Sequence, residues 1–174
     1  MKSVVFLIAT ALATITQGAS VPTAETTELI HSEIMNLTDT LWYKERYGDA
    51  DMATAAQDGA VLAKRDSCGS KMPYSVSDMR ALISNLQSDG GNDYVPAGHV
   101  HIWTRGTARI CTHNRYVFEN THVSHFEQGW GADLTMKNCC NPDGNPDCAG
   151  GGVTGHGDSG LAVDIITKNS AFSC

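Results

Sequence analysis

Histidines are the residues with the clearest potential for metal or acid–base chemistry in this chain. They form two closely spaced pairs, His99 with His101 and His122 with His125. The first pair would project from one side of a strand and the second would bracket a helix start, and neutral imidazoles are common zinc and copper ligands. A complete site needs further ligands, and the candidates are Glu127, His113 and Asp164. Because such polar faces are more often simply exposed, we expect neither a metal nor another cofactor.

A second arrangement would suit RNA cleavage. Glu119 or Glu127 with a histidine would supply a general acid and base. Arg109 or Arg115 would hold the phosphate. However, the chain has a net charge of −7, and its segment 66–174 has 7 basic and 11 acidic residues, whereas nucleic-acid binding depends on clustered cations. We therefore expect no nucleic-acid partner, and a small secreted ribonuclease is the alternative function.

The motif Gly157-Asp158-Ser159-Gly160 resembles the sequence around the nucleophile of chymotrypsin-like proteases. In those enzymes the serine needs a histidine base, an aspartate that orients the histidine, and amides that stabilise the oxyanion. They also use two β-barrels and a much longer chain. We therefore predict a polar turn before the last strand, and we rank a serine protease behind a ribonuclease.

The basic residues concentrate in one stretch, which holds Arg105, Arg109 and Arg115. On neighbouring strands these guanidinium groups would form a cationic patch for a carboxylate or phosphate surface. They are the candidate interaction surface, and pairing with nearby acidic residues is the alternative.

The N-terminus has the features of an export signal. Residues 1–19 begin with Met1-Lys2, continue with an apolar run from Val4 to Ile15 and end in small residues. The run is shorter than the ~18 apolar residues of a membrane span. We therefore expect a signal peptide, a secreted, extracellular protein and no stable membrane insertion.

A dibasic pair, Lys64-Arg65, separates a predicted propeptide over residues 20–65 from a mature domain over residues 66–174. After a signal peptide such a pair is typical of cleavage by a kexin-type protease. All six cysteines follow it, and an even set in an oxidising export route implies three disulfides. They are Cys68, Cys111, Cys139, Cys140, Cys148 and Cys174. The adjacent pair should join two different elements, and we expect its partners to be Cys111 and Cys68.

The predicted propeptide has two further features. Apolar residues between Thr27 and Tyr43 have roughly helical spacing, which predicts a partly helical segment. Asn36-Leu37-Thr38 in the same stretch is an N-glycosylation sequon.

Periodicity and turn residues predict the elements of the mature domain. A helix is predicted over 76–86, with Ser75 or Ser77 as its N-cap and Gly90-Gly91 at its end. Alternating runs predict strands over 100–103, 108–111, 115–120 and 160–167. Residues 141–152 are predicted to form a loop. The order indicates an α+β fold, a small antiparallel sheet with two helices on one face, stabilised by disulfides.

A capping box predicts the second helix. The Ser124 hydroxyl would accept the Glu127 amide, while the Glu127 carboxylate would reach back to the cap. Phe126, Trp130 and Leu134 recur at four-residue intervals, and Cys139-Cys140 end the helix. We expect the larger aromatic residues to lie in the core, namely Trp103, Tyr116, Phe118 and Trp130.

The order of these motifs is similar to the smut-virus killer toxin family and to related small cysteine-rich fungal effectors. The similarity rests on Ala108–Cys111, the helix ending at Cys139-Cys140, the Cys148–Gly152 loop and Gly160–Asp164 before Cys174. The resemblance implies a two-layer α/β sandwich that acts on a target-cell surface or a host protein. We therefore expect a proteolytically matured toxin or virulence effector that works by surface binding and is not an enzyme.

Overall fold

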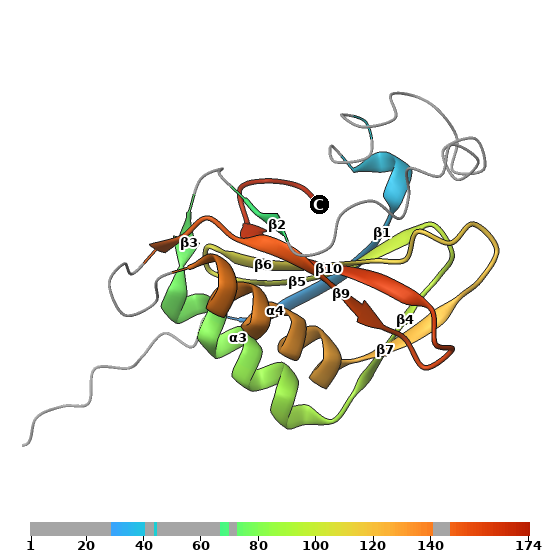
Figure 1. Cartoon of the computed structure of the whole chain (residues 1–174), viewed down its shortest axis with the longest axis horizontal. Coiled ribbons are helices and arrows are strands. Elements are labelled where there is room, and N and C mark those ends of the chain that lie inside the picture. Colours follow the sequence, from blue (N-terminus) through green and yellow to red (C-terminus); the bar gives the residue numbers. More distant parts are fainter. Residues whose placement is uncertain (1–28, 41–43, 45–66, 70–72, 141–146) are drawn as a thin grey trace, which may run out of the picture.

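The structure is a computed structural model, and it describes residues 29–40, 44, 67–69, 73–140 and 147–174. In these residues two helices pack against one face of a six-stranded sheet (Figure 1). The predicted α+β class, with two helices on one face of an antiparallel sheet, is therefore confirmed. The predicted signal peptide and the Lys64-Arg65 pair lie outside the described residues.

Neighbouring strands of the large sheet run antiparallel throughout. In spatial order they are β1 (His31–Asn36), β5 (His99–Arg105), β6 (Ala108–His113), β10 (Ala162–Asn169), β9 (Gly151–His156) and β2 (Ser67–Cys68). Two short ladders lie beside the sheet: β3 (Tyr74–Ser75) pairs with β8 (Asp147–Cys148), and β4 (Asn92–Val95) pairs with β7 (Thr121–Ser124). β5, β6 and β10 correspond to predicted strands.

Both helices begin at the predicted caps. In α3 (Val76–Asp89) the Ser75 hydroxyl accepts the Asp78 amide, and Gly90 ends the helix in the left-handed conformation at φ 70°. In α4 (His125–Cys139) the Ser124 hydroxyl accepts the Glu127 amide at 3.0 Å. The Glu127 carboxylate, however, accepts the His156 amide of β9 instead of reaching back to the cap. The predicted capping box is thus half formed, because its acid ties the helix to the sheet.

The helix-side cluster is the larger of two apolar cores and includes Met79, Leu82, Leu86, Ile110, Ala132 and Ile165. Glycine brings α4 close to the sheet: a Cβ at Gly131 or Gly155 would lie 2.7 or 2.6 Å from the Ile165 Cδ1 atom. Because α4 approaches the sheet over these glycines, it buries its glycine-bearing face against the sheet and turns its large aromatic residues outward. Phe126 and Trp130 are exposed, as is Phe118, so the expectation that Trp130 and Phe118 are core residues is wrong.

The far-side cluster lies on the opposite face of the sheet and consists of Leu37, Val100, Ile102, Cys111 and Cys174. Val100 and Ile102 alternate with residues that face the helices, as neighbouring strand residues do. Leu37 belongs to the short 3-10 helix η1 (Leu37–Asp39), which follows β1. Figure 1 shows η1 and the C-terminus together on the side away from α3 and α4.

Three local predictions are corrected by the structure. The segment predicted as partly helical contains β1, because antiparallel pairing with β5 prevails over weak helical periodicity. Residues 115–120 form a loop, because the Asn114 side chain donates to the Val95 and Glu119 carbonyls and accepts the Tyr116 amide. Part of the predicted loop 141–152 belongs to β9, whose glycines conceal its strand character.

Three disulfides join the six cysteines, as predicted. Cys139 and Cys140 do pair with different elements, namely Cys68 of β2 and Cys148 of β8. The expected bond to Cys111 is wrong: Cys111 faces away from the helices and pairs with Cys174 in the far-side cluster. Within the described ranges, neither helix is long and apolar enough to cross a membrane.

Candidate functional site

The densest group of chemically active side chains surrounds Asp93 on the helix side of the sheet. Four elements contribute to it: the end of α3, the strands β4 and β5, and the first turn of α4. We call this group the Asp93 network, and it consists of Asp89, Asp93, His101, Trp103, His125 and Gln128.

Asp93 receives donors from two directions. The Trp103 indole donates to Oδ2 at 3.0 Å, and the Gln128 amide donates to the same oxygen at 2.7 Å. His101 Nδ1 also lies 3.1 Å from Oδ2. Gln128 in turn accepts the Thr112 hydroxyl at 2.8 Å. The Asp93 carboxylate is therefore fixed by contacts with both the sheet and α4.

His125 bridges the two aspartates of the network. Its Nδ1 atom lies 2.5 Å from Asp89 Oδ1, and its Nε2 atom lies 3.1 Å from Asp93 Oδ1. Each ring nitrogen of His125 therefore faces a carboxylate oxygen, one from α3 and one from β4. The Trp103 ring packs edge-on against His125, with the ring centroids 5.0 Å apart.

Burial and hydrogen bonding shift two pKa values in the network. Burial lowers the pKa of His101, which is 4% exposed, and the charge of Asp93 opposes this shift. The pKa of Asp89 is lowered, first by the hydrogen bond from the Gly91 amide and then by His125. Three members of the network, His101, His125 and Gln128, are buried, whereas Asp89 is exposed at the end of α3. These contacts between two helices and two strands suit holding the elements in place better than contacting a substrate.

No protein-family model, curated protein or solved structure matches the chain. The geometry and the sequence are thus the basis for any functional assignment.

The two predicted histidine pairs are rearranged in the fold. His101 and His125, one from each pair, meet at Asp93, whereas His99 contacts the Ala97 carbonyl and His122 lies 3.2 Å from Asp158. The nitrogen atoms of these four rings therefore face carboxylates or backbone and do not converge on one metal position.

His113 lies apart from the other histidines, beside the two cysteines of the far-side cluster. Burial lowers its pKa well below the usual value, and the charges of Arg115 and Lys168 add to the effect. Its ring lies close to Cys111 and Cys174, the one group of three potential metal ligands within 4.8 Å in the described part of the chain. Because these sulfurs form a disulfide, they are not the thiolates that bind zinc or copper.

The Ser159 hydroxyl donates to the Thr121 hydroxyl at 2.8 Å. Asp158 accepts the His122 amide, so this part of the protease-like motif fixes the β9–β10 turn. The motif is the predicted polar turn, and the contacts of Ser159 are not those of an activated nucleophile.

The three candidate arginines of the predicted cationic patch are distributed over both faces of the sheet. Arg105 lies opposite Ala108, whose side chain is in the helix-side cluster. Arg109 donates to the Phe172 carbonyl at 2.9 Å, and Arg115 forms an ion pair with Asp164. Arg109 and Arg115 are thus engaged in contacts within the protein, and Arg105 lies on the other face of the sheet. The three arginines therefore do not form one cationic patch.

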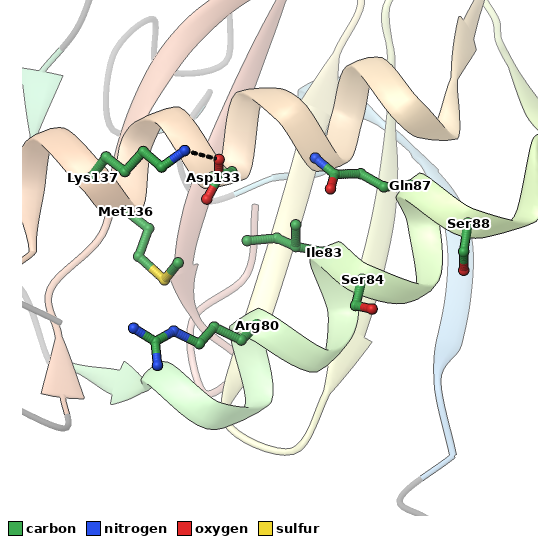
Figure 2. A pocket seen from close by; sticks show the side chains of 8 residues that line it. All are labelled: Arg80, Ile83, Ser84, Gln87, Ser88, Asp133, Met136 and Lys137. Atoms are coloured by element: carbon green, nitrogen blue, oxygen red, sulfur yellow. Dashed lines mark hydrogen bonds and ion pairs between the residues drawn. The ribbon is translucent and has the colours of Figure 1, made fainter. Parts of the chain in front are cut away.

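A shallow groove of about 470 Å³ runs between the outer surfaces of α3 and α4. Figure 2 shows Arg80 and Ile83 on α3 opposite Met136 on α4, with Lys137 paired to Asp133 at 2.5 Å. The groove holds charged and apolar groups but no histidine or cysteine.

Sequence reasoning missed the central role of Asp93 and the strand within residues 29–40. The first has a weak signal, since Asp89 and Asp93 flank a Gly-Gly turn directly after a helix. The second has a stronger one, since Ile30 and Ile34 would share one face of a strand and Met35 and Leu37 would share the other.

Proposed function

We propose that this protein is a secreted, proteolytically matured toxin or virulence effector of the killer-toxin type, and that it acts by binding the surface of target cells or a host protein. The sequence supports export and cleavage through its apolar leader and its Lys64-Arg65 pair. The fold, a disulfide-stabilised α/β sandwich, is the architecture that the killer-toxin resemblance implies.

The observation that carries the proposal is the pairing of the disulfides. All three lie within residues 68–174, so each would survive a cut between Arg65 and Asp66. No disulfide joins the segment 29–40 to the rest, because all six cysteines follow the cut. Hydrolysis of that one peptide bond would therefore separate the chain into two covalent pieces and leave the cross-linked part intact.

A binding function is supported by where the reactive groups lie. His101 is buried, His125 is held between Asp89 and Asp93, and the Ser159 hydroxyl is bonded to Thr121. Large apolar side chains lie at the surface instead, among them Phe118 at 86% exposure and Phe126 at 58% exposure. Exposed aromatic residues are typical of contact surfaces.

The test is to express the full chain in a secreting host, purify the product and measure its N-terminal sequence, its binding to fungal and plant cells and its damage to them. We expect an N-terminus at Asp66 and saturable binding that survives the joint changes His101→Gln and His125→Gln. An active product that retains the segment 20–65 would contradict the proposed maturation.

The hydrolase alternative is tested with the same preparation. Purified product is incubated with yeast RNA and with casein, and a matched preparation carries His101→Gln and His125→Gln or Ser159→Ala. We expect turnover of neither substrate. RNA cleavage that the histidine changes abolish would replace the binding function with a ribonuclease, and casein cleavage that Ser159→Ala abolishes would replace it with a protease.

A further inference from the structure

Residues 29–40 occupy a site on the part of the chain that follows Arg65. β1 pairs antiparallel with β5 over six residue pairs, from His31 with Thr104 to Asn36 with His99. The segment then turns through η1, where the Leu37 amide donates to the Gly98 carbonyl at 2.8 Å. It therefore combines backbone pairing along a sheet edge with a fixed turn at the end.

Side chains anchor this segment on both faces of the sheet. Leu37 is 1% exposed and fills the far-side cluster beside Val100 and Ile102. On the helix side, Ile30 packs against the helix-side cluster, whereas Ile34, which pairs with His101, is 48% exposed. The segment thus covers an apolar surface mainly through Leu37 and Ile30.

Loss of the segment would change the character of β5. With β1 in place, β5 is paired on both sides, by β1 and by β6. Without it, the seven residues His99–Arg105 would form an edge strand beside an uncovered apolar surface. Exposed edges with unpaired amides and carbonyls readily pair with another strand, and exposed apolar patches mark interaction sites.

We propose that the outer edge of β5, with Val100 and Ile102, is the partner-binding surface of the mature protein, and that residues 29–40 cover it until cleavage after Arg65 lets them dissociate. The partner is a protein segment in extended conformation that adds to β5 as an antiparallel strand. This inference rests on the proposed maturation, because covalent attachment keeps the segment at high effective concentration beside the edge.

The bound segment indicates what the partner strand should look like. Met35 lies opposite Val100, and Leu37 enters the far-side cluster two residues later, so two alternate apolar residues define the main anchor. Glu33 and Ser32 are exposed, so polar residues are tolerated nearer the other end. Leu29, at 91% exposure, contributes no buried surface.

The first arm of the test uses a fluorescent synthetic peptide with the sequence of residues 29–40. The purified full chain is cleaved in vitro with a kexin-type protease, the peptide is added in excess, and binding is measured by fluorescence anisotropy and native mass spectrometry. We expect binding to the cleaved protein and none to the uncleaved protein, whose edge is occupied. A released segment with no peptide binding would overturn the proposal, as would a segment that stays bound.

Two leucines of the segment provide a matched control. The Leu37→Asp peptide should bind at least about tenfold more weakly, because it places a charge in the far-side cluster, while the Leu29→Asp peptide should bind like the unchanged one. Equal binding by the two variants would contradict the proposed site. A full chain with Lys64→Gln and Arg65→Gln should bind no peptide after protease treatment.

The second arm measures how much cleaved protein binds to cells when excess unlabelled peptide is present as a competitor. We expect the unchanged peptide and the Leu29→Asp peptide to block binding and the Leu37→Asp peptide to have little effect. Cell binding that no peptide reduces would refute the β5 edge as the partner surface and leave the proposed function standing. Peptide exchange without any cell binding would support the edge site and refute the proposed function.

Discussion

The helix-covered face of the sheet and the opposite face are packed by different parts of the chain. The helix-side cluster is built almost entirely from residues between Tyr74 and Ile165, with α3 and α4 as its lid. The far-side cluster is completed by Leu37 of η1 and by the C-terminal Cys174. One face is therefore largely independent of the residues before the dibasic pair, whereas the other depends on them.

This difference determines which cluster would keep its packing after cleavage and which would become accessible to a partner. A cluster covered by its own helices keeps its packing when the segment before Arg65 leaves. A cluster closed by that segment loses a fully buried leucine and becomes accessible. With the proposed cleavage, the same sheet would keep its core on one face and lose part of its cover on the other.

The largest expected effect comes from the disulfide that closes the far-side cluster. Removing it with Cys111→Ala and Cys174→Ala opens a loop with a sequence separation of 63, which should lower the free energy of unfolding by about 4 kcal/mol. The matched change, Cys140→Ala and Cys148→Ala, opens a separation of only 8 and should cost about 2.5 kcal/mol. Urea unfolding of the full chain measures both, and equal losses would contradict this ranking.

A pair of leucines tests the comparison directly. Leu82 on the helix side and Leu37 on the far side are both at most 1% exposed, so each change to alanine should cost about 2–5 kcal/mol in the intact chain. After cleavage and release of the segment before Asp66, the Leu82→Ala cost should remain, whereas the Leu37→Ala cost should disappear. Urea unfolding before and after cleavage provides the measurement, and a persistent Leu37 effect would show that the cover does not leave.

The helix-side elements could be predicted largely because their signals are local. Ser75, Ser124 and Gly90 specify helix ends through hydrogen bonds and backbone conformation that depend on few neighbours. β1 could not be predicted in this way, because its conformation depends on β5, which lies more than 60 residues away. β9 was missed because Gly131 and Gly155 make room for Ile165, a relationship visible only in three dimensions.

The candidate site was less predictable than the fold. His101 and His125 were recognised individually, but their meeting at Asp93 depends on how β4, β5 and α4 pack. The cysteine content predicted three disulfides, but the number of possible pairings left the connectivity open. Residues that could do chemistry can thus be identified from the sequence, but which residues they contact depends on tertiary packing.

The Asp93 network should contribute to stability on the helix side before and after cleavage. Asp93→Asn keeps the shape but removes the charge that faces His125, Trp103 and Gln128, and should cost about 2 kcal/mol. Asp133→Asn breaks only a partly exposed i,i+4 pair with Lys137 and should cost about 0.3–0.5 kcal/mol. Thermal or urea unfolding of the two variants compares them, and equal costs would show that the network is not a stabilising element.

Acid should destabilise both faces through their buried histidines. Burial lowers the pKa of His101 on the helix side and of His113 on the far side below 6.5. The unfolded chain then binds protons first, so stability is full above pH 6.5 and falls as the pH drops below it, by at most about 1.4 kcal/mol per pH unit for each group. His113→Leu should flatten this dependence in urea unfolding between pH 6.5 and 5, and an unchanged slope would contradict the assignment.

The smallest expected effect concerns the other leucine of the covering segment. Leu29 is 91% exposed and Leu37 is 1% exposed, although both lie within the same twelve described residues. Leu29→Ala removes no buried contact and should change the free energy of unfolding by less than about 0.5 kcal/mol. Urea unfolding of the intact chain gives the value. A loss comparable to that of Leu37→Ala would mean that the whole segment contributes through contacts along its length, and the far-side cluster would then not owe its closure to one buried side chain.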